Sequence, residues 1–95
     1  MRLHWTASAQ DDLASIYEYI AQENQQAAAR VVTTLVTYTE RQLVDYPRSG
    51  REGRVAGTLE LVIPKLPYIV PYRIKAGRLE ILRVYHAARL WPDQL

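Results

Sequence analysis

Hydrophobic residues recur every three or four positions over most of the first 46 residues, which is the period of an α-helix. One stripe consists of Ala9, Leu13, Ile16, Tyr17 and Ile20, and a second of Ala28, Val32, Leu35, Val36, Thr39, Leu43 and Tyr46. Ser8, with Asp11 three residues later, has the pattern of a capping box and predicts the start of the first helix. Asn24 predicts the cap of the second helix and Pro47 its end. A short connection between two helices predicts an antiparallel hairpin.

Outside the helices the period changes to two residues, which is the period of a β-strand. Residues 2–6 predict an N-terminal strand, and residues 58–63, 68–75 and 79–86 are rich in Leu, Ile, Val and Tyr. Short connections between the last three strands predict an antiparallel meander, and the helices need its apolar face to cover their own stripes. The predicted fold class is α+β, with an N-terminal strand and an antiparallel two-helix hairpin packed on a mostly antiparallel four-stranded sheet. Residues 1–95 form one domain in this prediction.

Strand alternation also assigns side chains to the two faces of the sheet. A three-residue turn around Gly77 places four residues on the face away from the helices, namely Glu60, Arg73, Arg83 and Tyr85. A two-residue turn would set Arg73 opposite Glu80 and tip Arg83 toward the core. Because burying an unpaired arginine is costly, the three-residue turn is favoured.

Composition narrows the class of protein further. The chain is 48% hydrophobic and 23% charged, which is typical of a globular domain. It has no cysteine and two histidines, so disulfides, thiolate metal sites and a structural zinc shell are excluded, and we expect neither metal nor cofactor. The chain lacks an apolar run of membrane-spanning length and a signal-like N-terminus, so we expect a cytoplasmic protein.

Charge is distributed unevenly along the chain. Residues 1–46 carry three arginines against six carboxylates, whereas residues 47–95 carry nine cations, seven of them arginine, against four carboxylates. A glycine-containing loop between the helices and the meander holds Arg48, Arg51 and Arg54, but it lacks the Lys-Ser/Thr of a P-loop. The basic half predicts a polyanion or an acidic protein segment as partner.

Four residues could carry phosphodiester chemistry. Glu60 or His86 could transfer protons, and Arg73 and Arg83 could stabilise charge on a phosphate in the transition state. Each also has an ordinary structural interpretation: a carboxylate on an open strand face is commonly solvated, strand arginines form cross-strand ion pairs, and a strand-end histidine is commonly a surface residue.

Several ordered motifs together resemble the RelE/ParE superfamily of toxins from type II toxin–antitoxin modules, in particular its plasmid-stabilisation branch. They are Pro47-x-x-Gly50-Arg51-x-Gly53-Arg54, Pro67-Tyr68-Ile69-Val70-x-Tyr72-Arg73 and Ile81-Leu82-Arg83-Val84-Tyr85-His86-x-x-Arg89-x-Trp91-Pro92. The resemblance implies a helix-hairpin-plus-sheet toxin that a cognate antitoxin holds inactive. It also implies residues that bind RNA or a partner protein, and we expect this role for Arg48, Arg51, Arg54, Tyr85 and Arg89.

The resemblance also implies two mechanisms. RelE-type members cleave mRNA on the ribosome, which would make Glu60 the base, Arg73 and Arg83 phosphate clamps and His86 the acid. ParE-type members bind DNA gyrase without being nucleases. The lysine pair of other RelE-type members is missing here, where Leu59, Leu61 and Val62 stand. The sequence favours mRNA cleavage slightly, with gyrase inhibition as the alternative. A non-catalytic nucleic-acid-binding module is less favoured, because no helix-turn-helix is visible.

Overall fold

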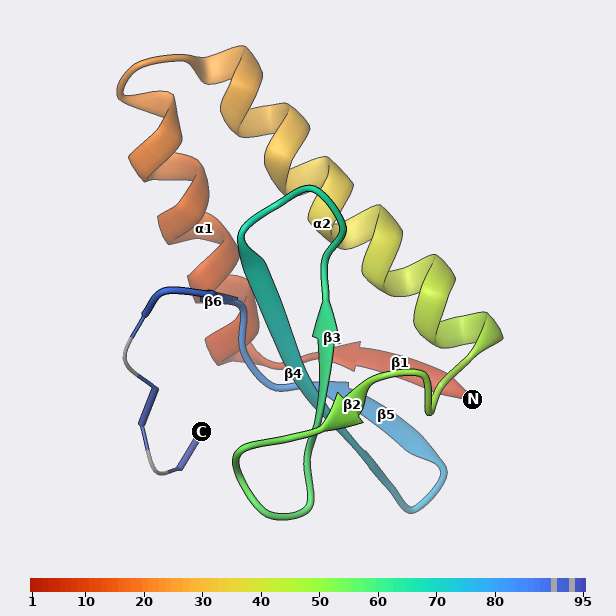
Figure 1. Cartoon of the computed structure of the whole chain (residues 1–95). Coiled ribbons are helices and arrows are strands. Elements are labelled where there is room, and N and C mark those ends of the chain that lie inside the picture. The colour runs from red at the N-terminus through yellow and green to blue at the C-terminus, as the bar shows by residue number, and fades with distance from the viewer. Residues whose placement is uncertain (90, 93) are drawn as a thin grey trace.

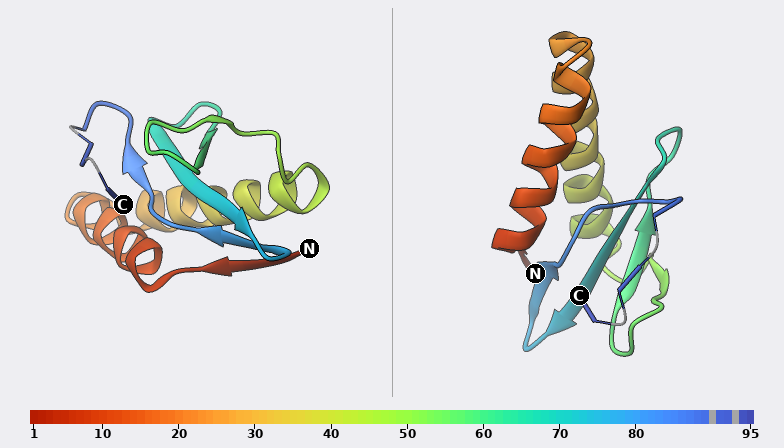
Figure 2. Two further views of the ribbon diagram at one scale, coloured as in Figure 1. Left: turned by 90° about the horizontal axis from the view of Figure 1, so that it is seen from below. Right: turned by 90° about the vertical axis from the view of Figure 1, so that its left-hand side faces the viewer.

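The computed structural model describes residues 1–89, 91–92 and 94–95. Within them the chain forms two helices and six strands, which follow one another in the order β1 (Arg2–Trp5), α1 (Ala7–Ala21), α2 (Gln25–Asp45), β2 (Arg51–Glu52), β3 (Leu59–Val62), β4 (Tyr68–Lys75), β5 (Arg78–Ile81) and β6 (Tyr85–His86). The helices form an antiparallel hairpin that covers one face of a single sheet, whereas loops and the C-terminal segment lie over the other face (Figures 1 and 2).

The helix boundaries follow local capping chemistry. Asn24 caps α2 as predicted, since its side chain accepts a hydrogen bond of 2.9 Å from the backbone N–H of Ala27. The cap of α1 is Thr6, whose hydroxyl accepts from the N–H of Ala9 at 3.1 Å, so the prediction of a cap at Ser8 was wrong by two residues. Thr6 is favoured because its hydroxyl also donates to the Leu82 carbonyl at 3.0 Å and ties the start of the helix to the sheet.

The sheet is mixed, with the order β1-β5-β4-β3-β2 and with β6 paired to β4. The N-terminal strand β1 runs parallel to β5, and all other pairs are antiparallel. The predicted α+β class and the mostly antiparallel sheet are therefore confirmed. The short strand β2 was not predicted, and β6 is the separated end of the predicted strand 79–86.

The hydrophobic core lies between the helix hairpin and the sheet. Buried side chains from α2, such as Leu35 and Leu43, meet the sheet-face residues of β3, β4 and β5. The largest fully buried residues of that sheet face are Tyr72, Leu79 and Ile81. Side chains alternate along each strand, so the neighbours of these residues point to the opposite face, which we call the far face.

The turn between β4 and β5 corrects one prediction. Lys75 pairs with Arg78, so the turn contains only two residues, Ala76 and Gly77, both with positive φ (52° and 75°). This is the type I′ turn, whose twist matches that of the flanking strands. The predicted three-residue turn was therefore wrong, and Arg73 lies opposite Glu80.

A β-bulge after β5 keeps Arg83 out of the core. Ile81 pairs with Tyr72 and Tyr85 pairs with Ile69, so two residues of β4 face three residues of the other chain segment. The carbonyl of Pro71 accepts from the N–H groups of both Leu82 (2.9 Å) and Arg83 (3.5 Å), as expected where one residue is inserted. The predicted continuous strand 79–86 is thus broken. Ile81, which unbroken alternation would place on the same face as Arg83, faces the core instead.

Candidate functional site

Glu60 lies on the far face as predicted, but it is buried there with a relative exposure of 2%. The Arg51 guanidinium donates to its Oε1 from Nε and Nη2 at 3.2 and 3.1 Å. The backbone N–H of Arg54 donates to Oε2 at 2.8 Å, and the Arg54 Nε lies 3.9 Å from the same oxygen. The prediction of an open face around Glu60 was wrong, because the loop from Gly50 to Thr58 folds over the strand and supplies these cations and this N–H group.

Arg73 forms a cross-strand ion pair. Its Nε donates to Glu80 Oε1 at 2.7 Å, and both side chains remain partly exposed. This hydrogen bond is the main reason why the pKa of Glu80 lies below its ordinary value. Arg73 is therefore on the far face, as predicted, but its guanidinium already has a carboxylate partner.

Arg83 turns away from the far face toward α1. Its Nε and Nη2 donate to the two carboxylate oxygens of Asp12 at 2.7 and 3.0 Å, and the N–H of Val84 donates to Asp12 Oδ2 at 2.9 Å. The hydrogen bond to Asp12 raises the pKa of Arg83 above its ordinary value. The bulge makes this possible because it frees the Val84 N–H and redirects the arginine. Arg83 was predicted to share an open face with Arg73, and that prediction was wrong.

Tyr85 is buried rather than exposed, with a relative exposure of 1%. The guanidinium groups of Arg83 and Arg89 lie 4.7 and 4.9 Å from the centre of its ring, and Trp91 meets it edge to face at 4.9 Å. Arg54 in turn lies 4.0 Å from the centre of the Trp91 ring. Cation–π contacts of this kind link the C-terminal segment to the loop that covers Glu60.

His86 is exposed and lines a cleft between α1 and the sheet. This cleft has a volume of about 390 Å³, and its lining includes Arg83, Arg89 and two tyrosines, Tyr19 and Tyr68. The Nδ1 of His86 accepts from the N–H of Ala88 at 3.1 Å, and its ring meets Tyr68 edge to face at 5.6 Å. Burial raises the pKa of Tyr68, and the neighbouring Tyr19 raises it further.

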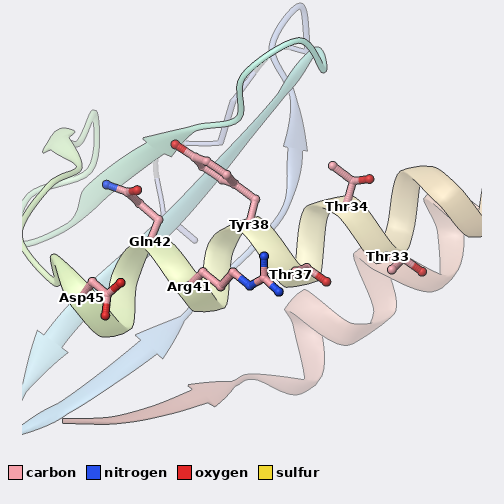
Figure 3. Close-up of a pocket in the computed structure, with 7 residues that line it drawn as sticks. All are labelled: Thr33, Thr34, Thr37, Tyr38, Arg41, Gln42 and Asp45. Atoms are coloured by element: carbon pink, nitrogen blue, oxygen red, sulfur yellow. The ribbon is translucent and has the colours of Figure 1, made fainter.

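Two further hollows lie along and beyond α2. The first has a volume of about 420 Å³ and is lined by the seven residues drawn in Figure 3: Thr33, Thr34, Thr37, Tyr38, Arg41, Gln42 and Asp45. The second follows the end of the helix and includes Arg48. Neither contains a predicted catalytic residue, and Arg48 is separate from the other loop arginines.

The predicted site residues thus fall into separate groups. Glu60 lies with Arg51 and Arg54, Arg73 lies with Glu80, and Arg83, His86 and Arg89 share the cleft beside α1. The described residues contain no group of histidines and carboxylates placed to hold a metal ion. Asp12 was missed as a partner of Arg83, since the two residues lie 71 positions apart and no local sequence pattern connects them.

Comparisons with known proteins define the class. The family model for the ParE toxin of the type II toxin–antitoxin system parDE matches residues 3–91. "Putative toxin Y4kP" of Sinorhizobium fredii is 46% identical over 94 residues, covering 99% of this chain and 96% of that protein. Toxin RelE2 of Caulobacter vibrioides is 37% identical over 86 residues, covering 90% and 94%.

A solved structure agrees with these sequence matches. The chromosomal ParDE toxin–antitoxin system from P. aeruginosa aligns with a TM-score of 0.81 and 30% identity, over 90% of this chain and 95% of that one. The chain is therefore a toxin of a type II toxin–antitoxin module and belongs to the ParE family. An antitoxin partner follows from that membership. Among the described residues, neither helix is long and apolar enough to cross a membrane.

Proposed function

We propose that this toxin arrests growth by binding a protein target, DNA gyrase, and that it does not cleave RNA. The observation that carries the proposal is the environment of Glu60, the one carboxylate that the sequence offered as a general base. A toxin acting on gyrase would work in the cytoplasm, as the sequence led us to expect.

A general base must come within hydrogen-bonding distance of the proton that it removes. Both oxygens of Glu60 already accept hydrogen bonds from Arg51 and Arg54, and the side chain is 1% exposed. A ribose hydroxyl could reach it only if the covering loop and its two arginines moved away. Glu60 is therefore better suited to hold the loop than to activate a nucleophile.

The two proposed phosphate clamps are occupied in the same way. Catalytic donors stabilise a transition state when they are aimed in advance at the developing charge. The guanidinium of Arg83 is aimed at Asp12, and that of Arg73 at Glu80, each at 2.7 Å. His86 opens into the cleft beside α1, whereas Glu60 lies on the far face, so a proton donor and a proton acceptor do not meet around one phosphate.

The experiment compares both activities with one preparation of purified toxin. We expect the toxin to block supercoiling of relaxed plasmid by gyrase and to leave mRNA whole in a reconstituted translation reaction. Toxin saturated with its antitoxin is the control and should leave supercoiling intact. Cleaved mRNA together with normal supercoiling would overturn the proposal in favour of ribosome-dependent cleavage, and inactivity in both assays would overturn gyrase as the target.

A further inference from the structure

Three cations lie side by side on neighbouring strands at one end of the sheet. The strand register pairs Arg2 of β1 with Arg78 of β5, and pairs Arg78 with Lys75 of β4. Adjacent strands are separated by about 4.8 Å, so the row, which we call the basic row, spans about 10 Å. Lys75 and Arg78 lie on either side of the tight turn that joins β4 and β5, which Figure 1 shows.

The basic row faces solvent on the far face. The next residues along the three strands are Leu3, Leu79 and Ile74, which pack on the helix side in the core cluster. Side chains alternate along a strand, so the basic row points away from the helices. Arg2, Lys75 and Arg78 are all exposed, and in the part of the chain that the structure describes they form no ion pair with a carboxylate.

A second row on the same face supports the first. His4, Glu80 and Arg73 are paired in register two residues further along the strands. Glu80 is the only carboxylate of the six residues, and it is already bound by Arg73. Arg78 and His4 both contribute to the low pKa of Glu80, as expected if they lie close to it. The two rows together carry four permanent cations and one anion.

Like charges placed directly opposite each other destabilise a sheet. Three adjacent cations without internal partners therefore lower the stability of the free protein, and an anionic ligand would relieve their repulsion. Because the cations lie in register on three adjacent strands, a ligand that presents several negative charges in a line matches them.

The chemistry of this surface favours duplex nucleic acid over protein or single strands. Protein interfaces usually have an apolar or aromatic centre, whereas exposed large apolar side chains of the described residues lie elsewhere, apart from Met1. Sites for single strands stack bases on aromatic side chains, and the two rows contain no Tyr, Trp or Phe. Arginine and lysine without stacking platforms suit the phosphates of a duplex.

We infer that the basic row binds the phosphate backbone of duplex DNA. The inference deepens the proposed function, because gyrase acts on duplex DNA and a toxin bound to it could contact that DNA as well. Binding through three phosphates releases counterions, so the affinity should fall by about 40-fold between 50 and 200 mM salt.

The test measures binding of a labelled 20-base-pair duplex by fluorescence anisotropy across that salt range. The row variant carries Arg2→Gln, Lys75→Gln and Arg78→Gln. The matched control carries Arg30→Gln, Arg41→Gln and Lys65→Gln, which removes the same charge from exposed positions outside the two rows. We expect the row variant to lose at least about tenfold in affinity at 50 mM salt and to reduce the slope of log K against log salt by about 2 to 3. The control variant should bind almost as wild type does.

Thermal melting accompanies the binding assay. The row variant should melt at or above the wild-type temperature, because repulsion between the cations is removed, and Arg78→Gln alone provides a second variant with a smaller loss of binding. An unchanged salt slope in the row variant, or equal losses in the two triple variants, would overturn the inference. Tighter binding of single-stranded RNA or of polyglutamate than of the duplex would overturn it as well. The assay contains no gyrase, so its failure is distinguishable from failure of the supercoiling experiment.

Discussion

The two faces of the sheet are covered through different interactions, hydrophobic packing on the helix side and ion pairs with aromatic contacts on the far face. On the helix side, aliphatic and aromatic residues such as Leu35, Leu43 and Ile81 fill the space below the hairpin. On the far face, a buried glutamate, Glu60, is held by the arginines of a loop, and the C-terminal segment is joined to the sheet through Tyr85 and Trp91.

This difference explains why residue types alone suggested a catalytic site. A carboxylate, several arginines and a tyrosine on one sheet face resemble a phosphodiester site, yet here they hold a loop and a chain end in place. Among the described residues, exposed cations without an ion-pair partner lie side by side on the far face at the basic row, where carboxylates are scarce. Measurements of the free energy of unfolding can compare how much the core on the helix side and the ion pairs on the far face contribute.

The largest expected effect comes from the helix side. Leu35→Ala removes a fully buried side chain at the centre of the core and should lower the free energy of unfolding by about 2 to 5 kcal/mol. Val44→Ala on the same helix is the control, since Val44 is exposed and its loss should cost less than about 0.5 kcal/mol. Urea unfolding measures both, and equal losses would mean that the core does not lie under α2.

A smaller effect is expected from the buried carboxylate. Glu60→Gln keeps the size of the side chain but removes its charge, and should cost about 1 to 3 kcal/mol, because the hydrogen bonds from Arg51 and Arg54 weaken while those half-exposed cations can still be solvated. Glu52→Gln on the exposed strand β2 is the matched control. Proteolysis within residues 50–58 should also become faster in the Glu60 variant alone. If both variants unfold at the wild-type urea concentration, Glu60 does not hold the loop.

The Asp12–Arg83 pair should contribute somewhat less. In the wild type, three donors share the two carboxylate oxygens of Asp12. Asp12→Asn leaves them one acceptor oxygen, and we expect the free energy of unfolding to fall by about 1 to 2 kcal/mol. Asp11→Asn tests charge alone, because Asp11 is exposed and precedes Asp12 on the same helix. In a double-mutant cycle, Asp12→Asn and Arg83→Gln together should cost less than the sum of their separate losses, because each alone already breaks the pair. Additive losses would contradict the pairing.

The smallest effect concerns pH. The hydrogen bond from Arg73 lowers the pKa of Glu80 below its ordinary value of 4.5. A carboxylate whose pKa is lower in the folded state stabilises the fold at neutral pH, and this contribution is lost as the pH falls below 4.5 through the lowered pKa. The melting temperatures of wild type and Glu80→Gln should therefore differ most at pH 7 and converge in acid. A constant difference from pH 7 to pH 3 would contradict the assignment.

The sequence predicted the elements that have a periodic pattern of hydrophobic residues or a recognisable cap. The helical stripes, the Asn24 cap and the strand at residues 68–75 follow from local sequence patterns, and the structure confirms them, except that Tyr17 and Tyr46 of the predicted stripes are exposed. The partners of Glu60 could not be predicted, because they lie in a loop without any period. The resemblance of the motifs identified the toxin family correctly.

The predicted arrangement of the candidate site was wrong because of one turn, at Ala76–Gly77, and one bulge, after β5. The cost of burying a charge favoured a three-residue turn at Gly77, since unbroken alternation after a two-residue turn would place Arg83 in the core. The inserted residue at Leu82–Arg83 removes that cost by resetting the alternation, and Asp12 then neutralises the arginine. A bulge of this kind leaves no signal in hydrophobic pattern alone, because Leu82 and Val84 fit either arrangement.

The central claim is that the toxin acts by binding and not by cutting RNA. Mapping of mRNA 5′ ends in growth-arrested cells, for wild type and for His86→Gln, tests it most directly. We predict that both proteins arrest growth and that neither produces cuts within codons. Cuts within codons in the wild type, reduced by about 10²- to 10⁴-fold together with relief of growth arrest in His86→Gln, would contradict the claim and restore His86 as a general acid.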